Sequence, residues 1–304
     1  LKSSQNGKIL SSIADEGVVT FRVLPNGSLA RLNSAKIKGM RGCHLSTSKA
    51  DDYIFISGFH DGKITVLHLN EDGSVGDIAD GVFHKGLGSV AERSFRPHVS
   101  CSRLTPDERF LMVADLGIDQ IKVYRFDHKD GKIALVDTIR CELESAPKYF
   151  MFSSDGRFFY VLYEMKNVIE VYSYKEGERV PIVEKIQTIS STGSKPNQLT
   201  AACAMHFSPD EKHVFCSNAG DNTVSMYDRD DETGMLTLRF CLPISGDYPK
   251  DIAIFPGGEH LASINHEGSI SFFKIDYEKG LLVMSDRSIK VNEPNCCEIV
   301  KIGD

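Results

Sequence analysis

Short apolar stretches alternate with turn-forming residues along the whole chain, and no segment keeps the apolar spacing of an amphipathic helix. The clearest stretch is PKYFMFSSDGRFFYVLYEMKNVIEVYSY, which runs from Pro147 to Tyr174. It contains two strand-like segments around the turn SSDG, then a polar loop and a third strand-like segment. The pattern predicts an all-β protein made of short strands.

The third strand-like segment of this block recurs with a period of roughly 50 residues. Its apolar anchor has counterparts at Phe21, Leu67, Tyr124, Tyr172, Tyr227 and Phe273. Each anchor follows a turn such as TPDER, SSDGR or SPDEK and a β-rich segment, and a second turn such as KDGKI then leads into a final strand. Four strands per repeat are typical of the blades of a β-propeller.

Six such repeats are present, and the first begins at its second strand because only a short segment precedes GVVTFRV. The C-terminal segment NEPNCCEIVKI (292–302) has the pattern of the first strand of another blade. We therefore expect one domain over residues 1–304. Its expected fold is a seven-bladed β-propeller of four-stranded antiparallel blades, with the N-terminal strands of one blade missing. A six-bladed ring is the main alternative.

Composition narrows the possible partners. The net charge is −7 without a basic block, which argues against nucleic-acid binding, because phosphate neutralisation needs clustered Lys and Arg. No apolar run is long enough for a transmembrane helix and no signal peptide is visible, so we expect a cytoplasmic protein without membrane contacts. The eight Cys and ten His form no metal-binding motif, so neither a metal nor another cofactor is expected.

Charged or polar residues recur at two places in the predicted blades. In a propeller, the start of the first strand and the loop after the second strand reach the same end of the central channel. The first place holds His44, His98, Lys148 and Lys250, and the second holds Glu164, Asn218 and His266. A rim of His and Lys side chains would attract a carboxylate or a phosphate.

Several stretches match a known pattern in order and combination. They are ERSFRPHVS, TPDERFLMVADLGIDQIKVYRFDHKDGKIALVDTI, APKYFMFSSDGRFFYVLYE, SNAGDNTVSMYD and PKDIAIFPGG. Together they resemble the propeller-type lactonase family, which includes bacterial 6-phosphogluconolactonase and carboxy-cis,cis-muconate cyclase. The resemblance covers nearly the whole chain. It implies a seven-bladed propeller whose active site lies at one mouth of the channel.

The resemblance also implies catalytic residues, namely Arg93, His98, Lys148 and Glu164. This chain departs from the family pattern at several positions. Lys148 and Lys250 replace Arg, Ser100 replaces a second His, and Ala204 and Ala219 replace Glu and Arg. Lys recognises a carboxylate as a point charge, without the planar fork of Arg, so these exchanges bear on activity.

The leading hypothesis is a hydrolase that opens a small anionic sugar lactone such as 6-phosphogluconolactone. His98 or Glu164 would act as general base on water, and Lys148 with Arg93 would stabilise the developing oxyanion. The residues expected to bind the substrate are Lys250, His44, Asn218 and His266. The alternative is a catalytically silent propeller that binds a small anionic ligand or a partner protein.

Overall fold

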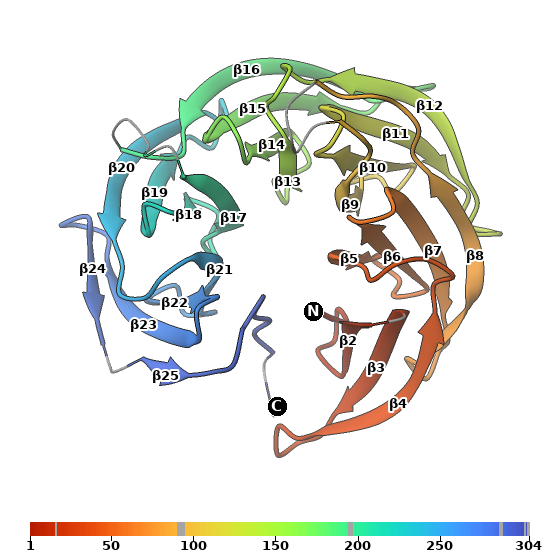
Figure 1. Cartoon of the computed structure of the whole chain (residues 1–304), viewed down its shortest axis with the longest axis horizontal. Coiled ribbons are helices and arrows are strands. Elements are labelled where there is room, and N and C mark those ends of the chain that lie inside the picture. Colours follow the sequence, from red (N-terminus) through yellow and green to blue (C-terminus); the bar gives the residue numbers. More distant parts are fainter. Residues whose placement is uncertain are drawn as a thin grey trace. The chain divides into compact units, whose positions relative to one another are not determined.

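The computed structural model describes residues 1–15, 17–89, 95–193, 197, 199–285, 288–300 and 302. Every regular element within these ranges is a β-strand, which confirms the all-β prediction. The same residues include no helix that is long and apolar enough to cross a membrane. The strands form six antiparallel sheets, in which strands that follow one another along the chain are hydrogen-bonded neighbours (Figure 1).

Contacts divide the chain into two compact units. The first comprises Leu1–Pro147, Glu176–Pro181 and Val300–Asp304, and the second comprises Lys148–Lys175 and Ile182–Ile299. The first three sheets are β1 (Lys2–Ser3), β2 (Ile9–Ala14), β3 (Gly17–Val23) and β4 (Leu29–Lys36); β5 (His44–Thr47), β6 (Tyr53–Gly58), β7 (Lys63–Leu69) and β8 (Val75–Phe83); and β9 (Val99–Leu104), β10 (Phe110–Asp115), β11 (Gln120–Phe126) and β12 (Ile133–Arg140).

The remaining three sheets have the same order of strands. They are β13 (Pro147–Phe152), β14 (Phe158–Tyr163), β15 (Val168–Lys175) and β16 (Ile182–Ser190); β17 (Ala201–Phe207), β18 (His213–Ala219), β19 (Thr223–Arg229) and β20 (Leu236–Pro243); and β21 (Pro249–Ile254), β22 (His260–Asn265), β23 (Ser269–Asp276), β24 (Leu281–Met284) and β25 (Ile289–Lys290). In the last sheet β24 and β25 pair with opposite ends of β23, so together they take the place of a fourth strand.

The predicted repeat is confirmed at its anchors. All six anchor residues lie in the third strand of their sheet, and five of the six are buried. In five sheets the pairing between third and fourth strands shifts register immediately before the anchor. Such bulges bend a strand and increase its twist. The anchors therefore mark a conformational repeat as well as a sequence repeat.

The turns between first and second strands are held by side chains that the sequence repeats. In SSDGR, the Ser153 hydroxyl donates to Asp155 Oδ1 at 2.6 Å, and the Arg157 backbone N–H donates to the same oxygen at 3.0 Å. Gly156 adopts a φ of 70°, a conformation that favours glycine. Burial alone would raise the pKa of Asp155, but these hydrogen bonds and the Arg157 side chain lower it to about 2.

In every sheet except the first, the second strand is the most deeply buried. All six residues of β6, β10 and β14 are buried, because their side chains pack on both faces of the sheet. A fully buried large apolar side chain contributes roughly 1.5–3 kcal/mol. Residues that directly follow these strands are therefore attached to the most stable part of the sheet.

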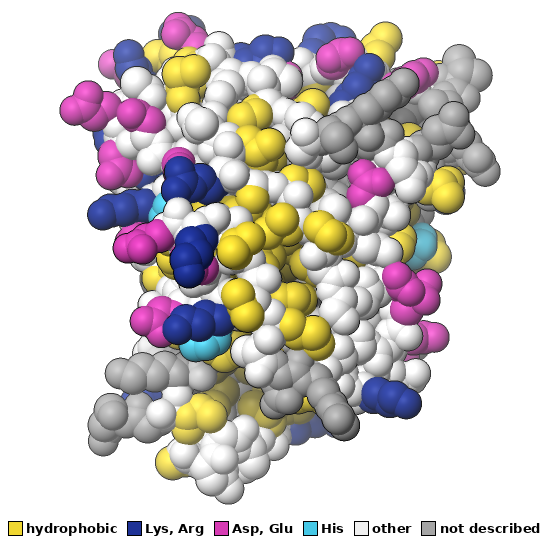
Figure 2. Space-filling model, turned by 90° about the vertical axis from the view of Figure 1, so that its left-hand side faces the viewer, with side chains coloured by type: hydrophobic (Ala, Val, Ile, Leu, Met, Phe, Trp, Pro, Cys, Tyr) yellow, Lys and Arg dark blue, Asp and Glu magenta, His cyan; other side chains and the backbone are white. Residues whose placement is uncertain are grey.

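The outer strands are more exposed. Figure 2 views the side of the second unit on which β20 and β24 lie, and shows hydrophobic side chains gathered there beside Lys and Arg. On β24, Leu281, Val283 and Met284 are all exposed. The outer strand of this sheet therefore presents an apolar surface.

Two details of the predicted architecture are wrong for the residues described. The seventh blade does not form, since these residues make six sheets and 292–300 contain no strand. A first strand needs the second strand of its own sheet as a partner, and the described residues offer none to this segment. The first sheet, expected to begin at its second strand, instead begins with a first strand of two residues, in which Lys2 pairs with Ser11.

Candidate functional site

Lys148 and Glu164 form an ion pair in the second unit. Lys148 lies at the start of β13, and Glu164 directly follows the neighbouring antiparallel strand β14. Antiparallel pairing places the start of one strand beside the end of the next, so a separation of sixteen residues closes to contact. Lys148 Nζ lies 2.7 Å from Glu164 Oε2, and the two side chains are 27% and 12% exposed. The pair is thus ordered by the sheet and still reaches solvent.

The surroundings of Lys148 keep it charged. Its Nζ lies 3.8 Å from the sulfur of Cys203, which is buried in β17. Burial opposes the charged form, but Cys203, the Glu164 carboxylate and Tyr248 together outweigh it and raise the pKa of Lys148. Lys148 is therefore a fixed positive charge at neutral pH, suited to an anion or a developing oxyanion.

A second lysine of the same unit stands in the equivalent place of the last sheet. Lys250 in β21 donates from Nζ to Asn295 Oδ1 at 2.6 Å. The amide of Asn295 in turn donates to the backbone oxygen of Glu293 at 3.1 Å. The segment after β25 thus reaches the start of β21 and positions this lysine at an exposed site.

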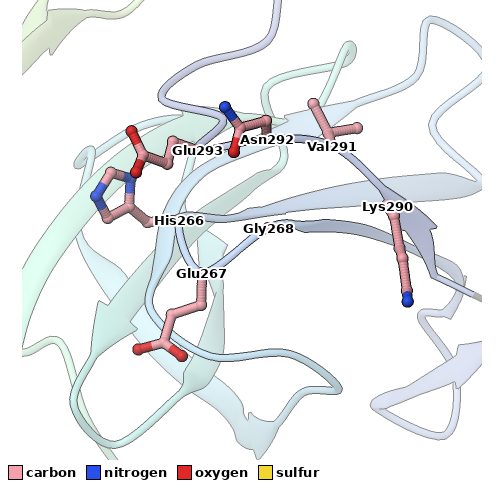
Figure 3. Close-up of a pocket in the computed structure, with 7 residues that line it drawn as sticks. All are labelled: His266, Glu267, Gly268, Lys290, Val291, Asn292 and Glu293. Atoms are coloured by element: carbon pink, nitrogen blue, oxygen red, sulfur yellow. The ribbon is translucent and has the colours of Figure 1, made fainter.

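His266 lies in the turn between β22 and β23, where it lines a pocket of about 610 Å³. The other lining residues are Glu267, Gly268, Lys290, Val291, Asn292 and Glu293. Figure 3 shows the His266 ring and the Glu293 carboxylate on one side of the pocket, with Lys290 on the other. His266 Nδ1 is buried and has no hydrogen-bond partner among the described residues. The pocket presents polar groups of both charges.

In the first unit, His98 directly precedes β9, and its ring contacts Phe59. Its Nδ1 lies 2.7 Å from the backbone oxygen of Phe59, which can only accept a hydrogen bond. The two rings stack, with centroids 4.4 Å apart. The bond to a carbonyl places the proton of the neutral ring on Nδ1 and leaves the lone pair on Nε2, as a hydrogen-bond acceptor or base requires.

Two residues expected to bind substrate instead make contacts inside the protein. His44 Nδ1 accepts a long hydrogen bond from the Ser102 backbone N–H, at 3.4 Å, and the pKa of His44 is lowered, first by burial and then by Arg103. His44 is therefore neutral at pH 7 and offers no positive charge to an anion. Asn218 is fully buried, and its amide donates to the backbone oxygen of Ser191 at 2.8 Å.

Three of the residues that depart from the family pattern are either buried or hydrogen-bonded to the backbone. The Ser100 hydroxyl donates to the backbone oxygen of Pro147 at 2.9 Å, while Ala204 and Ala219 are buried. Arg93, which the resemblance assigns to the site, lies outside the described residues. Nowhere in the described ranges do three or more His, Cys, Asp or Glu side chains gather as metal ligands.

Sequence reasoning missed two neighbours of Lys148. Cys203 lies in β17, the first strand of the next sheet, and Tyr248 lies directly before β21. Both stand near the first-strand entry that Lys148 occupies in its own sheet. The repeat offset that predicts Lys148 also leads to these two positions, although neither carries a charged side chain like that of Lys148.

Successive four-stranded antiparallel sheets of one topology, with charged residues where first strands begin, define a β-propeller protein. Residues 1–299 match the description "Lactonase, 7-bladed beta-propeller", so the chain belongs to this family. The 6-phosphogluconolactonase of Bacillus subtilis (strain 168) is 26% identical over 304 residues, which cover 98% of this chain and 86% of the relative.

Solved structures are also similar to this chain. A candidate 6-phosphogluconolactonase from Bacteroides fragilis NCTC 9343 is 28% identical with a TM-score of 0.87, covering 97% of this chain and 85% of that one. A periplasmic gluconolactonase from Pseudomonas aeruginosa has a TM-score of 0.91 over 99% of this chain and 87% of its own. Its 22% identity makes it evidence for the fold alone.

Proposed function

We propose that this protein hydrolyses a small anionic sugar lactone, such as 6-phosphogluconolactone, at the Lys148–Glu164 pair. The observation that carries the proposal is this ion pair of 2.7 Å, partly open to solvent, at the start of a first strand in a member of the lactonase family. The naming of a relative as 6-phosphogluconolactonase supports the choice of substrate.

The proposed chemistry needs one base and one fixed cation. Glu164 takes a proton from water, and the water oxygen forms a bond to the lactone carbonyl carbon. The ammonium group of Lys148 stabilises the negative charge that develops on the carbonyl oxygen. The intermediate then collapses, the bond between this carbon and the ring oxygen breaks, and the ring oxygen takes up the proton that Glu164 accepted from water. The product is the open hydroxy acid.

The acidic group of the substrate would bind at Lys250, which Asn295 holds in place. His266 and its pocket would accept the sugar hydroxyl groups, since their polar atoms can both donate and accept hydrogen bonds. Arg93 and His98 remain predicted site residues through the family resemblance. A single domain, a role in carbohydrate metabolism and a cytoplasmic location likewise remain proposals.

The test is hydrolysis of 6-phosphogluconolactone by the purified protein, corrected for spontaneous opening. Unphosphorylated gluconolactone, assayed in parallel, tests the anionic requirement. We expect acceleration over buffer and a higher kcat/KM for the phosphorylated substrate. Equal rates with both lactones would refute the proposed anion site, and no acceleration with either would refute the hydrolase.

A second candidate is a silent propeller that binds an anionic ligand. It is favoured by Ser100, Ala204 and Ala219, which stand where the family pattern has reactive or charged side chains and which make packing or backbone contacts here. Binding of 6-phosphogluconate without any lactone turnover, measured by calorimetry, would select this candidate. Loss of 6-phosphogluconate binding in Lys250→Met would show that the ligand binds at Lys250.

A further inference from the structure

A buried pair of titratable side chains lies beside His98 in the first unit. His84, directly after β8, places Nδ1 2.7 Å from Asp115 Oδ2, and neither side chain has any solvent exposure. Asp115 ends β10, and its other oxygen accepts hydrogen bonds from the backbone N–H groups of His98 at 2.8 Å and Gly117 at 3.1 Å. Three donors thus converge on one buried carboxylate.

The charge state of this pair follows from its surroundings. His84 Nε2 is buried and has no hydrogen-bond partner among the described residues. A protonated ring would leave an N–H group without an acceptor there, which is costly, whereas the neutral ring leaves only a lone pair. Burial lowers the pKa of His84 and outweighs the opposing effect of Asp115. His84 is therefore neutral, and its Nδ1–H group donates to Asp115.

The chain around Asp115 encloses His98. The backbone N–H of Leu116 donates to the backbone oxygen of His98 at 3.0 Å, so both peptide groups of this residue are held. A side chain at Gly117 would place its Cβ 2.7 Å from His98 Cδ2 and 1.9 Å from the backbone oxygen of Arg96. With the backbone fixed in this way, the ring meets the carbonyl of Phe59 and presents its lone pair at Nε2.

In two other sheets, an amide side chain stands at the end of the second strand in place of Asp115, and it binds the segment that precedes the sheet. At the end of the second strand, Asn218 donates to the backbone oxygen of Ser191, and Asn265 donates to that of Ser245. An amide thus suffices to connect a second strand to the segment before its sheet. A carboxylate with a histidine partner goes further, because it accepts several N–H groups at once, among them that of His98.

We propose that His84 and Asp115 are positioning residues that hold His98 with Nδ1 on the carbonyl of Phe59, so that Nε2 is left to accept a hydrogen bond from the substrate or the attacking water. The role of His98 in the reaction rests on the proposed function. The positioning itself rests on the contacts of the first unit. A displacement of about 1 Å in a reacting group lowers the rate on the order of 100-fold. Loss of the contacts that position His98 is therefore expected to lower the rate of the reaction.

The test combines NMR and kinetics on the full chain. The variant His84→Asn keeps an N–H donor close to the place of Nδ1, whereas His84→Leu removes it; Asp115→Asn removes the charge. His213→Leu, which replaces a histidine at the start of β18, is the control. Long-range ¹H–¹⁵N spectra report which nitrogen of His98 carries the proton, independently of activity.

We expect a single Nδ1–H form of His98 in the wild type, His84→Asn and His213→Leu. His84→Leu and Asp115→Asn should show mixed forms of His98, with kcat/KM lowered about 10–100-fold and largely restored in His84→Asn. The proposal is overturned if His84→Leu keeps the wild-type spectrum of His98, or if His84→Asn loses as much as His84→Leu. If His84→Leu does not fold, Asp115→Asn decides by the same criteria. Absence of lactone turnover in the wild type would instead refute the proposed function, and the spectra would still test the positioning.

Discussion

Replacing Glu164 by Gln removes one charge from the ion pair and keeps the shape of the side chain. Unit charges at the observed 2.7 Å attract by about 6 kcal/mol at an effective dielectric constant near 20. Most of this attraction is offset by the cost of taking both groups out of water, and both remain partly exposed. The expected net destabilisation is about 1–2 kcal/mol.

This loss of stability changes the unfolding temperature only slightly. The unfolding entropy is about 2.1 cal/mol/K per residue, so for a chain of 304 residues the midpoint falls by only about 2–3 °C. The rate should respond far more strongly, since loss of a general base lowers kcat by about 10²–10⁴. Scanning calorimetry and the lactone assay on the same preparation separate the two effects.

The same sheet contains a matched control. Glu170 in β15 pairs with Lys185 at 2.9 Å and accepts a hydrogen bond from the Tyr172 hydroxyl at 2.5 Å. Glu170→Gln should therefore cost at least as much stability as Glu164→Gln while leaving kcat within about twofold of the wild type. If the two variants lose activity to the same extent, the loss reflects weakened folding, and the catalytic role of Glu164 is refuted.

Three further outcomes follow from named contacts. Lys148→Met should lower kcat/KM by about 10²–10³, and Lys148→Arg, which keeps a cation there, should retain most activity in steady-state kinetics; equal losses would contradict a charge-based role. The pKa of Asp155 is about 2, so this carboxylate stabilises the fold above its ordinary pKa of about 3.9, and the contribution is lost as the pH falls toward 2. Asp155→Asn should therefore be less stable than the wild type in urea at pH 7, with a smaller difference at pH 3; a constant difference would contradict this. Gly117→Ala places a Cβ 1.9 Å from the backbone oxygen of Arg96 and should cost about 3 kcal/mol in urea denaturation, and a neutral result would show that the loop has room.

The repeat made most of the fold predictable. Turn residues such as Asp155 and anchors such as Tyr172 act locally, so their spacing identifies strands without knowledge of the tertiary structure. The ion pair of Lys148 and Glu164 was predictable for the same reason, because antiparallel pairing of adjacent strands converts an offset along the chain into a contact.

Contacts between different sheets were not predictable in this way. Cys203 approaches Lys148 across two sheets of the second unit, and His84 reaches Asp115 from the end of the preceding sheet. Neither contact follows from spacing within one repeat. The strand predicted for the C-terminal segment is absent for a related reason. A strand-like pattern forms a strand only where a partner strand is available.

The central claim is that Lys148 and Glu164 act as one unit on the lactone. A double-mutant cycle of Lys148→Met and Glu164→Gln, measured as kcat/KM for 6-phosphogluconolactone, tests it most directly. Residues that act as a unit are strongly non-additive, so each single variant should lose nearly as much as the double variant. Additive losses, or single variants as active as the wild type, would contradict the account.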